Sequence, residues 1–514
     1  MVKLIWNAKI QNESVKPKNK DPSPFRVSEI INSPLTAHDY PENATKHSFV
    51  DKNDRELSID NNWYNILACG ENKSFMESLL KDFSQKINLI YIDPPFATGA
   101  DYELKILIGE HQKILNDVAY DDKWKNGLDS YLTFMDERLN LMKKLLSNHG
   151  SIYIHLDWHV SHYIKILMDD IFGKENFRNE IIWAYPAASA RTRRYFMRSF
   201  DVILFYSKSD EYVFNDDPNI YMEYSKRVKK ALKRDEKGIF YYRGGSHDGK
   251  KLSRKVYVNQ KGIFPRDVWN DIPYIRANTL EYQGFSTQKP ERLLKRIILA
   301  SSNENDIIAD FFCGSGTTLA VAEKLNRNWI GCDNSKNNVH VAKKRLIDIN
   351  NSNDVMNWKQ RYKGDLSKFK ILYQEDRKNA KSIPPEFLTK NLRNVNQQDL
   401  SKVPEIKTKI REKGNKVVIE LCDFYYNNYD LISESFKKKI LSFSDWVDCW
   451  AVGFNSDEDI FNTAWISYRM PKNRRLELNS YPFEYNNPDN YMMMIKIIDI
   501  FGNEFYKPIQ ITVE

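Results

Sequence analysis

The sequence predicts an α/β fold, a doubly wound parallel sheet that carries an inserted basic segment and an additional all-β unit at the C-terminal end. Three observations lead to this expectation. Apolar strands alternate with amphipathic helices between residues 61 and 350, a basic segment interrupts this alternation, and the chain changes to period-2 segments from about residue 405. With 514 residues the chain exceeds what one hydrophobic core normally supports, so we expect two or three domains.

The first half of the α/β region follows a polar, proline-containing segment, residues 1–60, that we interpret as an extended arm or peripheral cap. Within 61–208 we expect strands at 65–69, 87–92 and 151–156, helices at 73–83, 128–148 and 160–172, and a terminal hairpin formed by 180–185 and 201–206. The nearly all-apolar run at 87–92 is typical of a parallel strand buried on both faces.

The alternation resumes in residues 276–350, after the inserted segment 209–275. There we expect a helix at 290–300 with proline in its first turn, a strand at 306–311, a helix at 316–325 and a strand at 329–333. Residues 351–404 are charged and helical or linker-like. Residues 405–514 predict a separate β-sandwich.

The charge of the chain is concentrated in one segment. The whole chain carries a net charge of +8, and the segment from Arg191 to Lys255 alone has 17 Lys/Arg against 9 Asp/Glu, an excess of 17 − 9 = +8. Such a patch is the electrostatic footprint of a polyanion ligand, although composition alone leaves a merely solvated basic surface equally open.

Other classes of protein are disfavoured by composition. No run approaches the roughly 18 consecutive apolar residues of a membrane span, and the first residues lack the apolar core of a signal peptide. The five cysteines are scattered, without metal-binding or disulfide spacing, so we expect no metal and a cytoplasmic location.

The tetrapeptide Asp93-Pro94-Pro95-Phe96 directly follows the buried strand 87–92. An acidic side chain and a carbonyl held by two prolines can accept the two hydrogens of an exocyclic amino group, which aims the nitrogen lone pair at a methyl donor. Phe96 provides a face on which an extruded base can stack. The alternative is a proline-stiffened loop, but the position after an apolar strand favours the functional interpretation.

The sequence from Asp310 to Thr318, DFFCGSGTT, is a strand–loop–helix with two glycines, Gly314 and Gly316, where the backbone can approach a ligand closely. Asp333, at the end of the next strand, is typical of a carboxylate that binds the ribose of an adenosine-containing cofactor. The loop is too short for a dinucleotide fingerprint and lacks the P-loop lysine, so NAD and ATP are disfavoured.

A third motif is STQKPERL, Ser286 to Leu293, at the start of the expected helix at 290–300. Taken alone it indicates only the start of a helix with proline in the first turn. Its place ahead of the glycine loop makes it a candidate rim of the cofactor pocket.

Together these motifs resemble the β class of DNA amino-methyltransferases, in which the DPPY/DPPF motif precedes the FxGxGT loop and a recognition region lies between them. YIDPPFATGADYE, HGSIYIHLDWHVSHYIKILMDDIFG and STQKPERLL resemble in particular the modification subunits of type III restriction systems and their solitary relatives. The resemblance covers roughly residues 61–350. It implies a permuted, Rossmann-like methyltransferase sheet that binds S-adenosylmethionine. The C-terminal KIIDIFGNEFYKPIQITVE is weakly similar to Ig-like or PKD-like sandwiches.

The resemblance also implies roles. Asp93 and the Pro94 carbonyl hold the amino group, Pro95 stiffens the turn and Phe96 stacks. The implied cofactor-binding residues are Glu71, Thr287, Lys289, Pro290, Asp310, Phe312, Gly314, Gly316, Thr317 and Asp333. Lys289 and Pro290 are expected at the methionine end. Glu71 stands where relatives often have Asp, and Phe96 where Tyr is commoner, so a hydroxyl contact is lost.

The resemblance favours methylation of adenine N6, because cytosine-N4 enzymes more often carry SPPY; cytosine-N4 methylation is the alternative. Protein glutamine methylation is disfavoured because those enzymes place the cofactor loop first in sequence. An inert DNA-binding fold is disfavoured by the intact Asp93, Gly314, Gly316 and Asp333.

We expect double-stranded DNA as the partner, held by basic residues of the hairpin loop and of the inserted recognition segment. The candidates are Arg191, Arg193, Arg194, Lys226, Arg227, Lys229 and Lys230. Family analogy makes a homodimer and a restriction subunit possible partners, in a restriction-modification or solitary methylation role.

Overall fold

The computed structural model describes residues 6, 24–36, 63–99, 101–110, 113–122, 124, 127–185, 194–247, 250–375, 405–426, 429, 432–455 and 460–513. Within 33–36, 101–104, 106, 113–121, 245–247 and 250–252 it describes the backbone alone. No helix in the part of the chain so described combines the length and the apolar character needed to cross a membrane.

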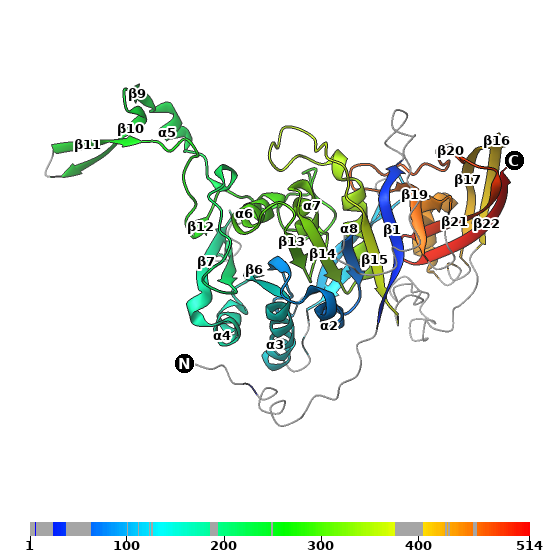
Figure 1. Ribbon diagram of the computed structural model, residues 1–514, viewed down its shortest axis with the longest axis horizontal. Helices are drawn as coiled ribbons and strands as arrows, with labels where there is room; N and C mark the ends of the chain where they lie inside the picture. The colour runs from blue at the N-terminus through cyan, green and yellow to red at the C-terminus, as the bar shows by residue number, and fades with distance from the viewer. Residues whose placement is uncertain are drawn as a thin grey trace.

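One large sheet organises the molecule, and Figure 1 shows it running through the centre of the body. The described residues place 14 strands in it, in the order β12-β7-β8-β6-β3-β13-β14-β2-β15-β1-β19-β18-β21-β22. The strands of its first part are β2 (Asn65–Cys69), β3 (Ile87–Ile92), β6 (Leu146–Leu156), β7 (Phe177–Ala184), β8 (Phe200–Ser207), β12 (Val268–Trp269), β13 (Ile307–Asp310) and β14 (Asn328–Asp333). Strands β6, β3, β13, β14 and β2 are mutually parallel.

Helices cover both faces of the parallel strands, as the alternation in the sequence predicts. Residues of α2 (Asn72–Phe83), α3 (Leu128–Leu145) and α4 (Ser161–Phe172) share one core with Ile90 and Ile92 of β3. Residues of α6 (Glu291–Ser301), α7 (Thr317–Lys324) and α8 (Lys336–Ile347) share the opposite core with Leu89 and Tyr91 of the same strand. Because successive side chains of β3 enter different cores, the strand is one continuous apolar run in the sequence.

The predicted terminal hairpin is confirmed, since β7 and β8 pair antiparallel and β8 joins β6. A second hairpin, β4 (Asp101–Ile108) with β5 (Lys113–Asp121), lies between β3 and α3 in the chain and was not predicted.

The interpretation of residues 1–60 as a peripheral arm is wrong for one segment. Strand β1 (Phe25–Thr36) lies inside the sheet, antiparallel to β15 (Phe369–Gln374) and parallel to β19 (Phe461–Tyr468). The strand β15 itself falls in the region expected to be helical or linker-like, so that expectation is wrong there, while residues 376–404 lie outside the described residues. Both strands are flanked by polar sequence, so the hydrophobic pattern alone does not indicate them.

The C-terminal residues form the predicted β-sandwich. One layer contains β19, β18 (Val447–Gly453), β21 (Asp489–Asp499) and β22 (Glu504–Val513), and the other β16 (Glu405–Lys413), β17 (Lys416–Tyr425) and β20 (Phe483–Glu484), with short helix α9 (Glu434–Lys437) between strands. The two layers share one hydrophobic core. The unit is nevertheless not separate, because β1 hydrogen-bonds its first layer to the parallel sheet.

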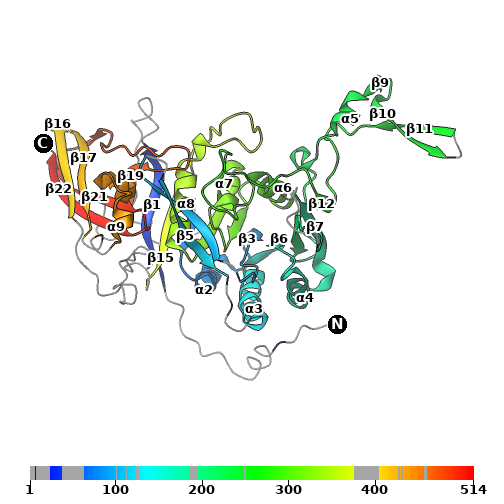
Figure 2. The same cartoon turned by 180° about the vertical axis from the view of Figure 1, so that it is seen from behind.

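The inserted basic segment projects from the body. Figure 1 shows α5 (Lys226–Lys230), β9 (Lys233–Asp235), β10 (Gly238–His247) and β11 (Lys250–Tyr257) extending away from the sheet, and Figure 2 shows the same arm from behind. Among the described residues, its three strands pair only with one another.

Candidate functional site

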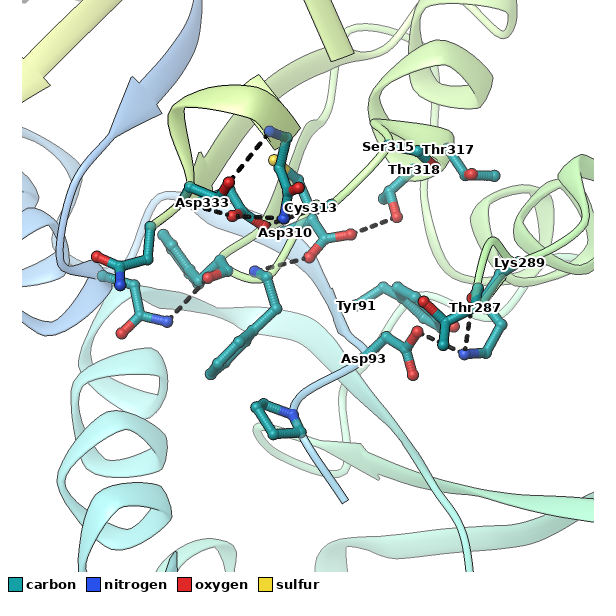
Figure 3. Close-up of a pocket in the computed structure, with 18 of the residues that line it drawn as sticks. Tyr91, Asp93, Thr287, Lys289, Asp310, Cys313, Ser315, Thr317, Thr318 and Asp333 are labelled. Carbon is teal, nitrogen blue, oxygen red and sulfur yellow. Dashed lines mark hydrogen bonds and ion pairs between the residues drawn. The ribbon is translucent and has the colours of Figure 1, made fainter. Parts of the chain in front are cut away.

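A pocket of about 520 Å³ lies at the carboxyl ends of β3, β13 and β14. In a parallel sheet the residues that follow neighbouring strands meet at one edge, so three distant segments of sequence converge here. The pocket is lined from the turn after β3 by Asp93 and Pro95, from the glycine loop after β13 by Gly314 and its neighbours, and from the end of β14 by Asp333. Figure 3 shows Asp93, Asp310, Asp333 and Lys289 around the same space.

Asp93 stands directly after β3 and its carboxylate faces a lysine. Lys289 Nζ donates to Asp93 Oδ2 at 2.5 Å, and the same ammonium lies 5.5 Å from the Phe96 ring centroid. Asp93 Oδ1 is buried and accepts no hydrogen bond from the described residues. One carboxylate oxygen is therefore held and the other is free to accept from a ligand.

The turn that carries Asp93 is fixed by a buried carboxylate that we did not predict from sequence. Asp122 accepts from Ala97 N at 3.0 Å, from Thr98 N and Thr98 Oγ1 at 2.8 Å, and from Trp124 Nε1 at 3.1 Å. Ala97 adopts φ 54°, a left-handed conformation that costs free energy in a non-glycine residue. The hydrogen bonds of Asp122 therefore offset the cost of an unfavourable backbone conformation in this turn.

Phe96 and Pro94 do not line the pocket in the described structure, whereas Pro95 does. Phe96 is half-buried and stacks on His155, with ring centroids 6.2 Å apart and an interplanar angle of 18°. The stacking role of Phe96 and the role of the Pro94 carbonyl stay predictions.

His155 belongs to a chain of hydrogen bonds beneath the pocket. Tyr91 Oη lies 3.0 Å from His155 Nδ1, His155 Nε2 lies 3.1 Å from Asp201 Oδ2, and Tyr185 Oη donates to Asp201 Oδ1 at 3.0 Å. Burial, with the charge of Asp93 second, raises the pKa of Tyr91 well above its usual value. Tyr91 thus stays a neutral phenol in the pocket wall. Sequence reasoning missed this chain, although its histidine lies in the HLDWH segment.

The glycine loop has the conformation that its residues predict. Gly314 and Gly316 have φ values of 49° and 73°, and a Cβ on Gly316 would lie 2.9 Å from Ala342 Cβ. Gly316 caps α7, so the first amides of that helix border the pocket. Both glycines are therefore required by backbone geometry.

Two carboxylates support this loop. Asp333 Oδ2 accepts from Gly314 N at 2.9 Å, and its Oδ1 accepts from Ser335 N and Asn338 Nδ2. Asp310 accepts from Phe312 N at 3.0 Å and from Thr318 Oγ1 at 2.5 Å. Burial raises the pKa of Asp333, and it raises the pKa of Asp310 to about 7.

Other predicted cofactor-binding residues have partners inside the protein. Thr317 Oγ1 accepts from Arg345 at 2.7 Å, and Pro290 caps α6 without lining the pocket. Glu71 lines the pocket, caps α2 through Ser74 N at 2.7 Å and pairs with Arg138. Burial would raise the pKa of Glu71, but the Arg138 guanidinium outweighs it and the pKa is lowered. Arg138, from α3, was not predicted.

The pocket has the size and the polar lining of a small-molecule site. Its volume falls in the range of small-molecule sites. Among the described residues, two buried oxygens without hydrogen-bond donors, Asp93 Oδ1 and Asn338 Oδ1, belong to residues that line it. Unpaired buried acceptors are costly, so each can gain stability by accepting a hydrogen bond from a ligand.

None of the predicted DNA-binding residues that the structure describes lines this pocket. Arg191 and Arg193 fall outside the described residues, and Arg194 is exposed in the loop before β8. Lys226, Arg227, Lys229 and Lys230 lie on α5 of the projecting arm, where Lys229 pairs with Glu223 at 2.6 Å.

The sequence is also similar to known proteins. Residues 87–344 match the N6/N4 family described as DNA methylase. The chain is 32% identical over 294 residues to the type II methyltransferase M.EcaI of Enterobacter cloacae, and the match covers 49% of this chain and 62% of that protein. It is 31% identical to M.HpaI of Haemophilus parainfluenzae, over 66% of this chain and 90% of that protein.

More distant relatives include the DNA adenine methyltransferase YhdJ of Escherichia coli strain K12, 28% identical over 61% of this chain and 92% of that protein. A probable type III HindVI Mod subunit of Haemophilus influenzae is 24% identical over 70% of this chain and 63% of its own length. Among solved structures, the putative DNA modification methylase TTHA0409 of Thermus thermophilus, in complex with S-adenosyl-L-methionine, aligns at 16% identity and TM-score 0.34, over 55% of this chain and 93% of that chain.

The family match spans both the Asp93 turn and the glycine loop, so the predicted resemblance is confirmed. The chain belongs to the N6/N4 family of DNA methylases, which use S-adenosylmethionine as their methyl donor.

Proposed function

We propose that the chain methylates the exocyclic N6 of an adenine that is extruded from double-stranded DNA, with S-adenosylmethionine as donor. The observation that carries the proposal is the position of Asp93 Oδ1, a buried unpaired acceptor in the same pocket as Gly314 and Asp333. When bound, S-adenosylmethionine supplies an electrophilic methyl group.

The chain's own residues hold and orient the reactants. Asp93 Oδ1 accepts one amino hydrogen, and the Pro94 carbonyl is proposed to accept the other, which directs the nitrogen lone pair. Lys289 keeps Asp93 Oδ2 occupied and the carboxylate fixed. Preorganised acceptors of this kind stabilise the positive charge that develops on the amino nitrogen.

The cofactor is proposed to lie along the glycine loop. Asp333 and Asn338 present acceptors for ribose hydroxyls, and Glu71 lines the same pocket and pairs with Arg138. We also propose Thr287, Pro290, Asp310, Phe312 and Thr317 as the surrounding shell. Asp310 and Thr317 act through the loop, since their polar atoms bond other residues of the chain.

A surface beside the pocket supports contact with DNA. Trp158 follows β6, whose residue His155 stacks on Phe96, and the Arg198 guanidinium lies 3.6 Å from the Trp158 ring centroid. Phe196, in the same loop as Arg198, is 98% exposed. Exposed aromatic rings beside arginines are suited to stacking on bases and pairing with phosphates.

Adenine is proposed as the target base because the acidic motif DPPF and the relative YhdJ both favour it. The relationship to a Mod subunit supports a restriction-modification role with a restriction subunit as partner, and a homodimer is proposed on the same analogy. We propose a cytoplasmic location on the basis of the proposed substrate.

Mass spectrometry of nucleosides from DNA incubated with the full chain and S-adenosylmethionine tests the proposal. We expect N6-methyladenine, and N4-methylcytosine without N6-methyladenine would contradict the assignment of the base. Asp93→Ala should abolish methyl transfer while DNA affinity and folding are retained; unchanged turnover would rule out the mechanism. Reversing the charges of Arg191, Arg193 and Arg194 together should raise the dissociation constant for DNA, and an unchanged constant would remove that loop from the interface.

A further inference from the structure

The projecting arm ends in a two-stranded ribbon, β10 paired with β11. The register places Phe240 opposite Tyr257, Tyr242 opposite Lys255 and Arg243 opposite Arg254. Because successive residues of a strand point to opposite faces, Arg243 and Arg254 lie together on the face opposite to Phe240, Tyr242, Lys255 and Tyr257.

The face that carries Phe240 is used for the arm's own packing. Phe240 is 4% exposed, its ring contacts Tyr242 and Tyr257 at centroid distances of 5.4 and 5.7 Å, and Lys255 Nζ lies 4.5 Å from its centroid. Asp235 accepts from Lys255 Nζ and Tyr257 Oη. The cations on this face are thus partly neutralised by a carboxylate.

The other face holds two unneutralised cations directly opposite each other. Arg243 and Arg254 are both exposed, and within the described part of the chain neither guanidinium has a hydrogen-bond or ion-pair partner. Like charges at directly opposed positions of a strand pair are destabilising. This pairing therefore costs the isolated arm stability, and an anionic or acceptor-rich ligand would offset that cost.

The composition of the arm indicates the class of ligand. From Lys226 to Lys255 it has 12 Lys/Arg against three acidic residues, Asp235, Glu236 and Asp248. The proposed function supplies a polyanion of matching charge, namely the DNA duplex. A two-stranded ribbon fits the major groove, which is about 12 Å wide.

Arginine rather than lysine at both opposed positions points to base edges. A guanidinium can donate two parallel hydrogen bonds to O6 and N7 of guanine, whereas phosphates accept equally from lysine. Opposed residues have Cβ atoms about 5 Å apart, and successive base pairs are spaced by about 3.4 Å, so both side chains can reach one short run of base pairs.

We propose that the β10–β11 ribbon enters the major groove of the DNA and that Arg243 and Arg254 read guanine there, while the lysines of α5 contact phosphates. The inference rests on the proposed DNA substrate and extends it. It requires at least one guanine in the recognition sequence.

Binding selection from a pool of randomised duplexes tests the inference without methyl transfer. The full-length protein should enrich a sequence with a guanine that the double variant Arg243→Lys/Arg254→Lys no longer enriches, although the charge is unchanged. The preference for guanine over other bases at that position should fall roughly ten- to hundred-fold. The charge-changing control Lys226→Ala/Lys230→Ala should weaken binding to all sequences and leave the enriched sequence unchanged.

A second measurement identifies the contacted atom. Replacing the enriched guanine by 7-deazaguanine removes the N7 acceptor, and it should weaken binding of the parent protein several-fold but not of Arg243→Ala/Arg254→Ala. That variant should melt no lower than the parent, because the opposed charges are gone. An unchanged enriched sequence in the lysine variant, or a parent protein that enriches no guanine, would overturn the inference. Absence of methyl incorporation into DNA would instead contradict the proposed function and leave the binding result standing.

Discussion

Lys289 Nζ lies 2.5 Å from Asp93 Oδ2. This contact joins the turn after β3 to the Lys289-Pro290 segment directly before α6, 196 positions later in the chain. The contact places the lysine of the TQKP segment at the proposed catalytic carboxylate. From the sequence we expected this lysine at the methionine end of the cofactor. Contact with Asp93 and a place at the methionine end of the cofactor are compatible, because the Lys289 side chain lines the pocket that both would share.

Lys289→Gln should lower kcat by roughly ten- to a hundred-fold, because a hydrogen bond to a charged group contributes about 1.5–3 kcal/mol and here holds the proposed acceptor in place. Steady-state methyl transfer to DNA measures this effect. Lys295→Gln, on the helix that follows but not lining the pocket, is the matched control and should leave kcat unchanged. Equal rates for the two variants would show that the ion pair is incidental.

Gly316→Ala should abolish cofactor binding and lower stability, because the added Cβ meets Ala342 Cβ at 2.9 Å in a left-handed backbone conformation. Gly414, in the turn between β16 and β17, has φ 59° and no atom within 4 Å of its would-be Cβ. Gly414→Ala therefore isolates the backbone cost, about 1–2 kcal/mol. Calorimetric titration with the cofactor and denaturant unfolding would compare the two variants. Similar losses of cofactor affinity and of unfolding free energy in both would contradict the steric argument.

Asp122→Ala should reduce kcat at least about tenfold with little change in cofactor affinity, because four donated hydrogen bonds are lost, three of them from the turn after Asp93, while the glycine loop follows a different strand, β13. The unfolding free energy should fall by about 2–4 kcal/mol, since partly buried donors are left unpaired. A rise in the cofactor dissociation constant as large as the drop in kcat would disprove this separation.

Glu29→Gln should destabilise the protein by about 3–5 kcal/mol, because the variant leaves buried cations undercompensated. Glu29, fully buried on β1, accepts from Lys343 of α8 at 2.5 Å and from Lys496 of β21 at 2.8 Å. The control is Glu375→Gln, which removes a more exposed ion pair with Arg26, a residue of β1 like Glu29. This variant should lower the unfolding free energy by less than about 1 kcal/mol. Denaturant titration measures both.

The ion pairs of Glu29 should also make the stability of the protein fall at acid pH. Burial would raise the pKa of Glu29, but Lys343 and Lys496 outweigh it and hold the pKa at about 2 instead of 4.5. A lowered carboxyl pKa contributes stability that is present above pH 4.5 and is lost as the pH falls towards 2. Unfolding free energies measured across this range should fall less steeply in Glu29→Gln than in the parent, and parallel curves would contradict the assignment.

Local sequence determined the motifs and most elements of the parallel sheet. Strand β3 could be predicted because both its faces are buried, and the glycine loop because Gly314 and Gly316 adopt left-handed conformations that other residues avoid. Chain order could also be taken from the sequence, which was sufficient to recognise the family. Strands β1 and β15 could not be predicted, because polar sequence flanks them and their partners lie far away in the chain.

Only the tertiary structure decided which polar groups meet. No spacing in the sequence indicates that Lys289 reaches Asp93, that Asp122 fixes the turn beyond it, or that Glu29 lies between a lysine of helix α8 and a lysine of strand β21. Motifs depend on backbone geometry within a few residues, whereas these contacts depend on strand order and helix placement, which are set by the packing of the whole chain.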